Sequence, residues 1–218
     1  MMIARRRQPT SQRWAIVVAA GSGSRFGGAK QFEPLRGRRV IDWSLAAARR
    51  SCDGVVCVLP PDRAGEEAGA DRSVPGGATR SASVRAGLAA VPDSAEVIVV
   101  HDAARPVAPD SLFRAVIEAV EGGADAAIPG VAVHDTIRHV DEGVVDRSSL
   151  VAVQTPQAFR ASALRAAHAG GGEATDDASL VEAAGGTVVV VPGCSHNLKI
   201  TDRGDLRIAA VLLEESDT

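Results

Sequence analysis

Five nearly continuous apolar runs, separated by segments with helical spacing, restrict the fold of this chain more than any other feature. Strands that are apolar along their whole length are typical of a parallel sheet covered by helices on both faces. The runs are WAIVVA (14–19), DGVVCVL (53–59), AEVIVVH (95–101), ADAAIPGVAV (124–133) and GTVVVVPG (186–193). The pattern therefore predicts an open α/β sandwich with a mostly parallel sheet.

Ala- and Leu-rich segments with helical spacing lie between these runs. The third begins at Pro109-Asp110-Ser111 and the fourth at Thr175 and Asp176, which are residue types that favour the first turn or the cap of a helix. The predicted helices cover 40–51, 80–91, 109–123 and 175–186.

One segment interrupts the alternation of strands and helices. The sequence DTIRHVDEGVVDRSSL predicts two short strands around Asp141-Glu142-Gly143, a β-hairpin inserted into the α/β pattern. We therefore predict a single domain over 14–218 with an arm at about 135–149. The basic start, residues 1–13, lacks the apolar middle of a secretory signal and is predicted to be a disordered tail.

Composition excludes several classes of function. The chain contains no apolar run of 18 residues, so we expect no membrane span. Aromatic residues make up 3% and tyrosine is absent, which argues against base stacking on nucleic acid. The three cysteines have neither metal-ligand spacing nor an even count, so reduced thiols and a cytoplasmic location are expected.

The loop after the first run, AAGSGSRFGGAKQF, lies where open α/β sheets bind ligands. Gly21 and Gly23 would let backbone N–H groups approach an anion. Two common phosphate motifs fail here: Phe26 replaces the third glycine of the dinucleotide fingerprint, and Lys30 lacks the preceding glycine and following hydroxyl of a P-loop. The alternative for the loop alone is a glycine-rich turn that carries two solvated cations, Arg25 and Lys30.

Three later segments add polar residues, and we expect those of HDAARP at the same edge of the sheet as the first loop. HDAARP contains Asp102 and Arg105 just after a strand, GGATRSASV contains Ser83 near a helix start, and HNLKITD contains Lys199. Each of these residues alone has a structural explanation, such as a cap or a turn. Together they favour a ligand site more strongly than the first loop does alone.

Together these motifs resemble the 2-C-methyl-D-erythritol 4-phosphate cytidylyltransferase family. The resemblance is carried in order by AAGSGSRFGGAKQF, HDAARP, DRSSLVAVQTPQAF, ATDDAS and NLKIT, from residue 14 to the last helix. It implies a Rossmann-like nucleotidyltransferase fold. It also implies transfer of CMP from CTP to methylerythritol 4-phosphate with release of pyrophosphate, a step of non-mevalonate isoprenoid precursor synthesis.

The resemblance also implies roles for individual residues. Arg25 and Lys30 would stabilise the transition state, and Arg147 and Lys199 would position the phosphate of the second substrate. Mg²⁺ or another divalent cation would be held mainly by the CTP phosphates, with no protein ligand assigned. Substrate contacts are implied for Ala20, Gly21, Gly23, Gly77, Ser83, Asp102, Ala103, Arg105, Thr136 and Thr155. Of these, Gly77 and Ser83 would read cytosine, although Ala78 stands where related sequences often carry an acidic residue.

The resemblance further implies a homodimer in which the arm completes the partner's site. Arg147 and Thr136 would then act in trans and Lys30 in cis. The alternative is an arm folded back on its own domain. His101 is expected to be a packed residue at the end of a strand, and Asp176 and Asp177 are expected to cap a helix.

Three other functions remain in competition. A ribitol-5-phosphate cytidylyltransferase would perform the same chemistry on another polyol phosphate. A dinucleotide-dependent oxidoreductase is disfavoured by Phe26. A nucleotide-binding regulator without catalysis is disfavoured by the joint presence of Arg25, Lys30, Arg147 and Lys199.

Overall fold

The computed structural model describes residues 12–65, 67 and 69–216. Residues 1–11, which form most of the predicted basic tail, lie outside this range, and Arg13 already belongs to the first strand. None of the described helices has the length and apolar character needed to cross a lipid bilayer.

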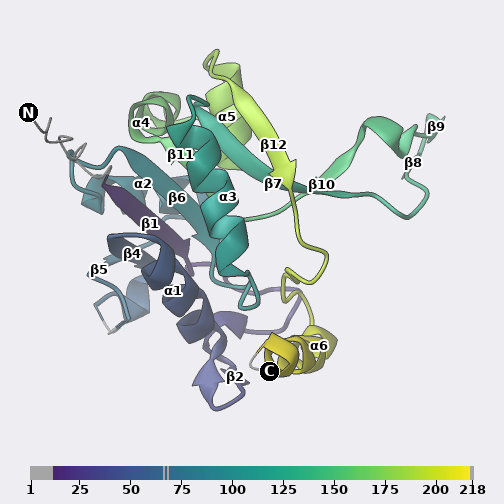
Figure 1. The fold of residues 1–218 in the computed structure, drawn as a ribbon. Helices are drawn as coiled ribbons and strands as arrows, with labels where there is room; N and C mark the ends of the chain where they lie inside the picture. The colour runs from purple at the N-terminus through teal and green to yellow at the C-terminus, as the bar shows by residue number, and fades with distance from the viewer. Residues whose placement is uncertain (1–11, 66, 68, 217–218) are drawn as a thin grey trace, which may run out of the picture.

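The centre of the molecule is the parallel half of an eight-stranded sheet, as the apolar runs predict (Figure 1). Ile16 in the middle strand lies opposite Val56 on one side and Val100 on the other. Every residue of β4 and β6 is buried. The order across this half is β6-β1-β4-β5, with β1 (Arg13–Val18), β4 (Gly54–Leu59), β5 (Arg72–Pro75) and β6 (Val97–Asp102).

The other half of the sheet mixes strand directions. A short strand, β11, lies antiparallel between β6 and β7, while β12 runs parallel to β7 and β10 antiparallel to it. Strands β10 and β11 of this half, and β5 at the edge of the parallel half, were not predicted. The strands of this half are β7 (Ala126–Ala132), β10 (Val151–Val153), β11 (Gln157–Arg160) and β12 (Val188–Pro192).

Helices cover both faces of the sheet, as expected for strands that are apolar on both sides. Ile41 and Phe113 belong to the core on one face, and Val84 and Leu164 to the core on the other. The first face carries α1 (Val40–Ser51) and α3 (Asp110–Glu121), and the second carries α2 (Arg80–Ala90), α4 (Ala161–Ala169) and α5 (Asp177–Ala183). Of these five helices, only α4 was not predicted.

A third, smaller core joins the glycine-rich loop to the last helix, α6 (Arg203–Ser216). Phe26 of the loop is 4% exposed and belongs to the same apolar cluster as Ala209 and Leu213. Short elements surround this cluster, namely β2 (Pro34–Leu35), β3 (Arg38–Arg39) and the 3₁₀ turns η1 (Lys30–Phe32) and η2 (Pro61–Arg63).

The predicted hairpin forms an arm that projects from the body (Figure 1). Its strands β8 (Arg138–His139) and β9 (Gly143–Val144) pair antiparallel, and the turn η3 (Arg147–Ser149) follows. Val140 is 90% exposed and Val144 65% exposed. The arm therefore leaves apolar side chains uncovered within the described chain.

Candidate active site

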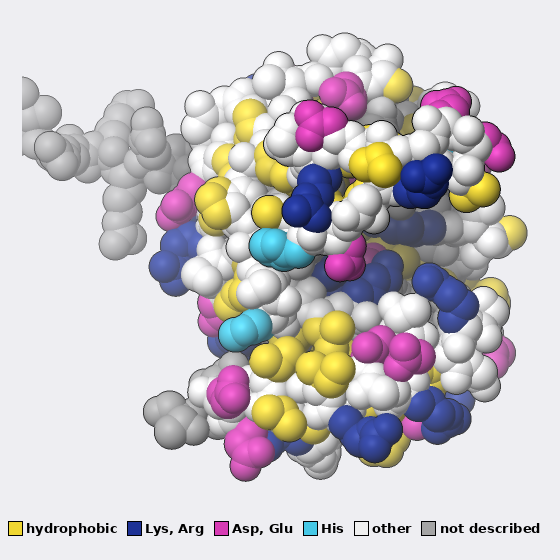
Figure 2. Space-filling model, turned by 90° about the vertical axis from the view of Figure 1, so that its right-hand side faces the viewer, with side chains coloured by type: hydrophobic (Ala, Val, Ile, Leu, Met, Phe, Trp, Pro, Cys, Tyr) yellow, Lys and Arg dark blue, Asp and Glu magenta, His cyan; other side chains and the backbone are white. Residues whose placement is uncertain are grey.

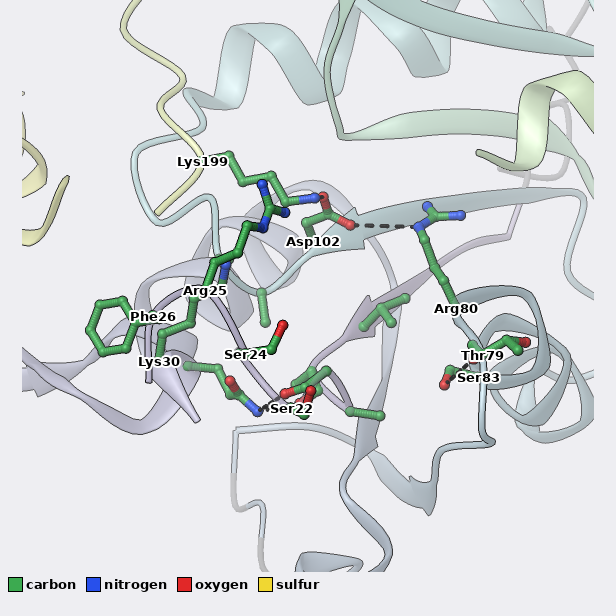
Figure 3. A pocket seen from close by; sticks show the side chains of 18 of the residues that line it. Ser22, Ser24, Arg25, Phe26, Lys30, Thr79, Arg80, Ser83, Asp102 and Lys199 are labelled. Carbon is green, nitrogen blue, oxygen red and sulfur yellow. Dashed lines mark hydrogen bonds and ion pairs between the residues drawn. The ribbon is translucent and has the colours of Figure 1, made fainter. Parts of the chain in front are cut away.

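Two adjoining cavities, of about 450 and about 320 Å³, open at the carboxyl ends of β1 and β6. Arg80, Asp102 and Lys199 line both cavities, so these three side chains form the shared wall (Figure 3). In Figure 2, Lys and Arg side chains lie in and around a hollow on one face of the molecule. A position at the strand ends is where open α/β sheets bind ligands.

The glycine-rich loop forms one wall of the first cavity, and Gly23 fixes its shape. Gly23 has φ +67°, and a Cβ there would lie 1.8 Å from the carbonyl oxygen of Gly28. The Gly23 carbonyl accepts hydrogen bonds from the backbone N–H groups of Phe26 and Gly27 at 2.9 and 3.0 Å. Gly21 has no atom within 4 Å of its would-be Cβ, so its open side faces free space. Backbone N–H groups in such a loop can bind an anion.

Gln31 fastens this loop to the first strand, a role that the sequence analysis missed. Its side chain is 4% exposed, and Nε2 donates to the carbonyl oxygens of Ala19 at 2.6 Å and Gly21 at 3.1 Å. The amide therefore holds the entrance of the loop from inside. Nothing in the sequence distinguishes this glutamine from a solvated one.

Two loop cations, Arg25 and Lys30, line the first cavity as predicted. The pKa of Lys30 is lowered, first because the side chain is partly buried and then because Lys199 and Arg25 add positive charge nearby. Cations that repel one another across a cavity favour the binding of an anion between them.

The amino end of α2 forms the opposite wall of this cavity. Ser83 Oγ donates to the Thr79 carbonyl at 2.9 Å and accepts from the Gly77 N–H at 3.2 Å. A Cβ on Gly76 would lie 2.3 Å from Cβ of Ala20, so the two loops approach each other closely only because residue 76 is glycine. Backbone groups and one hydroxyl thus shape a narrow slot.

Asp102 carries the negative charge of the shared wall. Lys199 Nζ lies 2.6 Å from Oδ2 of Asp102, while Arg105 Nε lies 4.0 Å from Oδ2 and Arg80 Nε 3.9 Å from Oδ1. Burial alone would raise the pKa of Asp102, but Lys199, Arg80 and Arg105 outweigh burial and lower it to about 2. The carboxylate is therefore ionised at neutral pH.

His101 and Thr155 hold the backbone next to Asp102. The Asp102 N–H donates to Thr155 Oγ1 at 3.0 Å, and this hydroxyl lies 3.2 Å from His101 Nδ1. His101 Nε2 contacts the Arg105 carbonyl at 3.3 Å, which fits an Nε2–H donor and a hydroxyl that donates to Nδ1. Burial lowers the pKa of His101 to about 4. The expectation of a packed histidine is confirmed.

The second cavity includes polar residues that the sequence analysis did not place there. Arg105 Nη1 donates to the Asn197 carbonyl at 2.7 Å, and Asn197 Nδ2 donates to Gln154 Oε1 at 3.2 Å. These contacts join the loops after β6 and β12. The unpredicted residues that line this cavity are Arg80, Gln154, Gln157, Thr175 and Asp176.

The two aspartates expected to cap α5 behave differently. Asp176 is the cap, since its Oδ1 accepts from the Ser179 N–H at 3.1 Å. Asp177 is not a cap, and that expectation was wrong. Its carboxylate is fully buried and pairs with Arg80 at 2.8 Å and His168 at 3.0 Å.

The structure brings together most, but not all, of the residues expected at the site. Thr136 and Arg147 lie on the exposed arm and line neither cavity, and Arg147 Nη1 donates to the carbonyl of His134. The first cavity is lined by Ala20, Gly21, Gly23, Arg25, Lys30, Gly77, Ser83, Asp102, Ala103 and Lys199. The second is lined by Arg105 and Thr155, together with Asp102 and Lys199.

The acidic residues are too few for a metal site made of protein ligands alone. Asp102 is the one carboxylate among the side chains that line the first cavity. Within residues 12–65, 67 and 69–216, no three His, Cys, Asp or Glu side chains are grouped as metal ligands. A divalent cation in this cavity would need most of its oxygen ligands from a bound substrate or water.

Comparisons with known proteins agree on one family. A family model described as 2-C-methyl-D-erythritol 4-phosphate cytidylyltransferase matches residues 14–215. The protein of that name from Saccharopolyspora erythraea is 45% identical over 220 residues, which cover 91% of this chain and 98% of that protein.

Longer relatives and a solved structure point the same way. The "Bifunctional enzyme IspD/IspF" of Clavibacter michiganensis subsp. michiganensis is 42% identical over 219 residues, which cover 91% of this chain but 53% of that enzyme. The chain thus spans about half the length of such bifunctional relatives. The crystal structure of 2-C-methyl-D-erythritol 4-phosphate cytidylyltransferase from Thermus thermophilus superposes with a TM-score of 0.81 and 38% identity, covering 94% of this chain and 100% of that one.

Proposed function

The chain belongs to the 2-C-methyl-D-erythritol 4-phosphate cytidylyltransferase family, and from this premise we propose that it transfers CMP from CTP to 2-C-methyl-D-erythritol 4-phosphate. The products are 4-diphosphocytidyl-2-C-methyl-D-erythritol and pyrophosphate. The observation that carries the proposal is the pair of adjoining cavities that share Asp102 and Lys199, with two further cations at the loop of the first. Two polyanions that must react with each other need such an arrangement.

The chemistry requires positioning and charge neutralisation more than proton transfer. A phosphate monoester oxygen attacks the α-phosphorus of CTP, the bond to the β-phosphate oxygen breaks, and pyrophosphate leaves. The attacking group is already an anion, so no general base is needed. Preorganised charges that act on the transition state lower the barrier in such reactions.

We assign the CTP phosphates to the glycine-rich loop. The loop amides beyond Ala20, with the open side of Gly21, would contact the triphosphate, and Arg25 and Lys30 would neutralise charge on the α-phosphoryl group and the leaving pyrophosphate. The surroundings of Lys30 support this assignment, because Lys199 and Arg25 place further positive charge near it, which attracts an anion. Arginine supplies a planar fork of donors and lysine a compact charge, so the two are not interchangeable.

The cytosine ring is assigned to the slot between Ala20 and the start of α2. Backbone groups at Gly77 and Ala78 and the hydroxyl of Ser83 would contact the base, and the close approach at Gly76 limits the width of the slot. A narrow slot rejects purines by size, and fixed donors and acceptors reject uracil.

The second substrate is assigned to the smaller cavity. Lys199 and Arg105 would contact its phosphate, and Asp102 and Thr155 its polyol. Arg147 and Thr136 would reach the same substrate from the arm of a second subunit, since neither lines either of the two described cavities in its own chain. The chain would thus act as a homodimer.

A divalent cation, Mg²⁺ by preference, fits the first cavity only as a companion of CTP. It would be held mainly by the CTP phosphates, with Asp102 as the one carboxylate in the cavity lining, and would supply charge neutralisation. We place the enzyme in the cytoplasm, where the nucleotide and reduced thiols are found. The described cysteines are free, and burial raises the pKa of Cys52 and Cys57 to about 12, as for inert thiols.

A coupled assay of pyrophosphate release tests the proposal. Turnover is expected only when CTP, methylerythritol 4-phosphate and a divalent cation are all present. Faster turnover with ribitol 5-phosphate would move the assignment to the related cytidylyltransferase. A preference for ATP or UTP would contradict the assignment of Gly77 and Ser83 to cytosine.

A further inference from the structure

A row of polar side chains, joined by hydrogen bonds and ion pairs, runs from the helical layer of α4 and α5 into the wall shared by the two cavities. His168 Nε2 lies 3.0 Å from Oδ1 of Asp177, and Arg80 Nη1 lies 2.8 Å from Oδ2 of the same carboxylate. Arg80 then reaches Asp102, with Nε 3.9 Å from Oδ1. Figure 3 shows Arg80 and Lys199 on different sides of Asp102.

The two cations contact different oxygens of Asp102. Lys199 contacts Oδ2 at 2.6 Å, and Arg80 faces Oδ1. Lys199 can therefore leave the carboxylate without disturbing Arg80. Lys199 follows β12 in an irregular segment, and its side chain is 42% exposed.

Arg80 is held much more firmly than Lys199. Its partner Asp177 has no exposed side-chain area, and both oxygens of Asp177 are occupied, one by Arg80 and one by His168. Arg80 is also the first residue of α2, directly after the cap Thr79, whose Oγ1 accepts from the Ala82 N–H. Both ends of the Arg80 side chain are thus fixed to rigid elements.

These contacts raise a problem of charge once substrate arrives. Lys199 can contact an incoming phosphate fully only if it loosens its 2.6 Å contact with Asp102. Asp102, which is 9% exposed, would then lose its nearest counter-charge beside new anions. A buried charge left without a partner is costly.

We propose that Arg80, anchored by Asp177 and His168, is a positioning residue that keeps Asp102 ionised and in place when Lys199 turns toward the phosphate of the second substrate. The inference rests on the proposed function for the identity of that substrate. The contacts that carry it belong to one chain and require no arm.

Kinetics of Arg80→Gln test this role, with Arg85→Gln as a matched control. Arg85 lies on the same helix and also pairs across to the segment before α5, with Glu173 at 2.7 Å and the Gly172 carbonyl at 2.9 Å, but lines neither cavity. Arg80→Gln should raise KM for methylerythritol 4-phosphate on the order of tenfold, the size expected for one lost charged contact, while KM for CTP changes far less. Arg85→Gln should leave both KM values unchanged.

A purely structural role for Arg80 predicts another result. In that case Arg80→Gln would lower kcat in proportion to the fraction of folded protein, or it would raise both KM values by the same factor. Either outcome overturns the proposal. Arg80→Lys keeps the positive charge but loses the planar guanidinium that spans two carboxylates. Its KM for methylerythritol 4-phosphate should therefore lie between those of the unaltered protein and Arg80→Gln. If Arg80→Gln does not fold, the two KM values of Arg80→Lys decide, with a smaller selective rise expected.

A stability measurement separates this inference from the proposed function. If the unaltered protein does not turn over CTP and methylerythritol 4-phosphate, the proposed function fails. A double-mutant cycle of Arg80→Gln and Lys199→Ala in urea then decides whether both cations serve Asp102. The urea concentration at the unfolding midpoint should fall further in the double variant than the sum of the decreases in the two single variants. Additive losses would overturn the shared role.

Discussion

The cavity walls and the arm both contain residues expected at the site, but they are built in opposite ways. In the walls, charged side chains from distant parts of the sequence contact one another, as Asp102 does with Lys199. On the arm, the described chain buries little: Val140 is 90% exposed, and Arg147 contacts a carbonyl of the same arm.

This difference shows which parts of the site a single chain holds in place by its own contacts, and that the arm is not one of them. The walls need no further protein to hold their geometry, because buried partners such as Asp177 and Gln31 fix the functional groups. A two-stranded hairpin is marginal in water by itself. The arm therefore depends on a covering surface, which in our proposal is a second subunit.

The largest effect should follow from removing one charge of the walls. Lys30→Ala should lower kcat by about 10²- to 10³-fold, because one preorganised charge that acts on the transition state is lost. Steady-state kinetics with saturating CTP and methylerythritol 4-phosphate measure it. KM for CTP should change less, since the loop amides and the metal still hold the triphosphate. A large rise in that KM with kcat unchanged would make Lys30 a binding residue only.

The pH dependence of stability should carry a contribution from His101 in the walls. The folded pKa is about 4 and the unfolded value 6.5, so the neutral ring is favoured in the folded state. This stabilisation is complete above pH 6.5 and is lost as the pH falls toward 4, by at most about 3 kcal/mol. Urea unfolding of His101→Gln from pH 7.5 to 4.5 should show a shallower fall. If the two proteins lose the same free energy of unfolding between pH 7.5 and 4.5, the predicted contribution of His101 is contradicted.

Mixing two inactive variants tests whether the arm completes a partner's site. Lys30→Ala damages the walls and Arg147→Ala the arm. If arms act in trans, each mixed dimer has one intact site, so random exchange should restore about a quarter of the sites. Pyrophosphate release after subunit exchange measures this, with mixed dimers verified by mass. If mixed dimers form and activity stays at the parental level, the arm acts within its own chain.

The smallest effect is expected for an apolar residue of the arm under conditions that keep subunits apart. Val140→Ala should change the free energy of unfolding by less than about 0.5 kcal/mol, because the exposed side chain buries little apolar surface. Val100→Ala in β6 is the matched control, since Val100 is fully buried and loses two methylene equivalents, at least about 1.5 kcal/mol. Urea titrations at low protein concentration compare them. Equal losses would place the arm against its own domain.

Three strands of the parallel half, β1, β4 and β6, were predictable because they are apolar along nearly their whole length. α1 was predicted with its observed bounds, 40–51, and α2, α3 and α5 lie within their predicted ranges. The strands β5 and β11 were missed because four residues such as RSVP or QAFR carry no clear period. α4 was missed for a related reason, since ASALRAAHA is short and small residues blur its apolar face.

The site could be predicted where short motifs place residues next to backbone turns, as at Gly23 and Gly77. It could not be predicted where the decisive partner is remote. Arg80 and Asp177 are 97 positions apart, and Asp177 looks like a second cap beside Asp176 until the fold buries it. Periodicity shows which apolar residues are buried, but not which charged residues are buried with them.

The third apolar cluster, which joins Phe26 to α6, has a consequence for how the molecule fluctuates. α6 packs in a cluster separate from the two main cores, so we expect its local opening to cost less free energy than unfolding of the central sheet. Each such opening uncovers Phe26 and releases the loop that holds Arg25 and Lys30. In our proposal a nucleotide binds to that loop, and it would favour the closed form by mass action. We therefore expect the amide hydrogens of α6 to exchange with solvent more slowly when the pocket is filled.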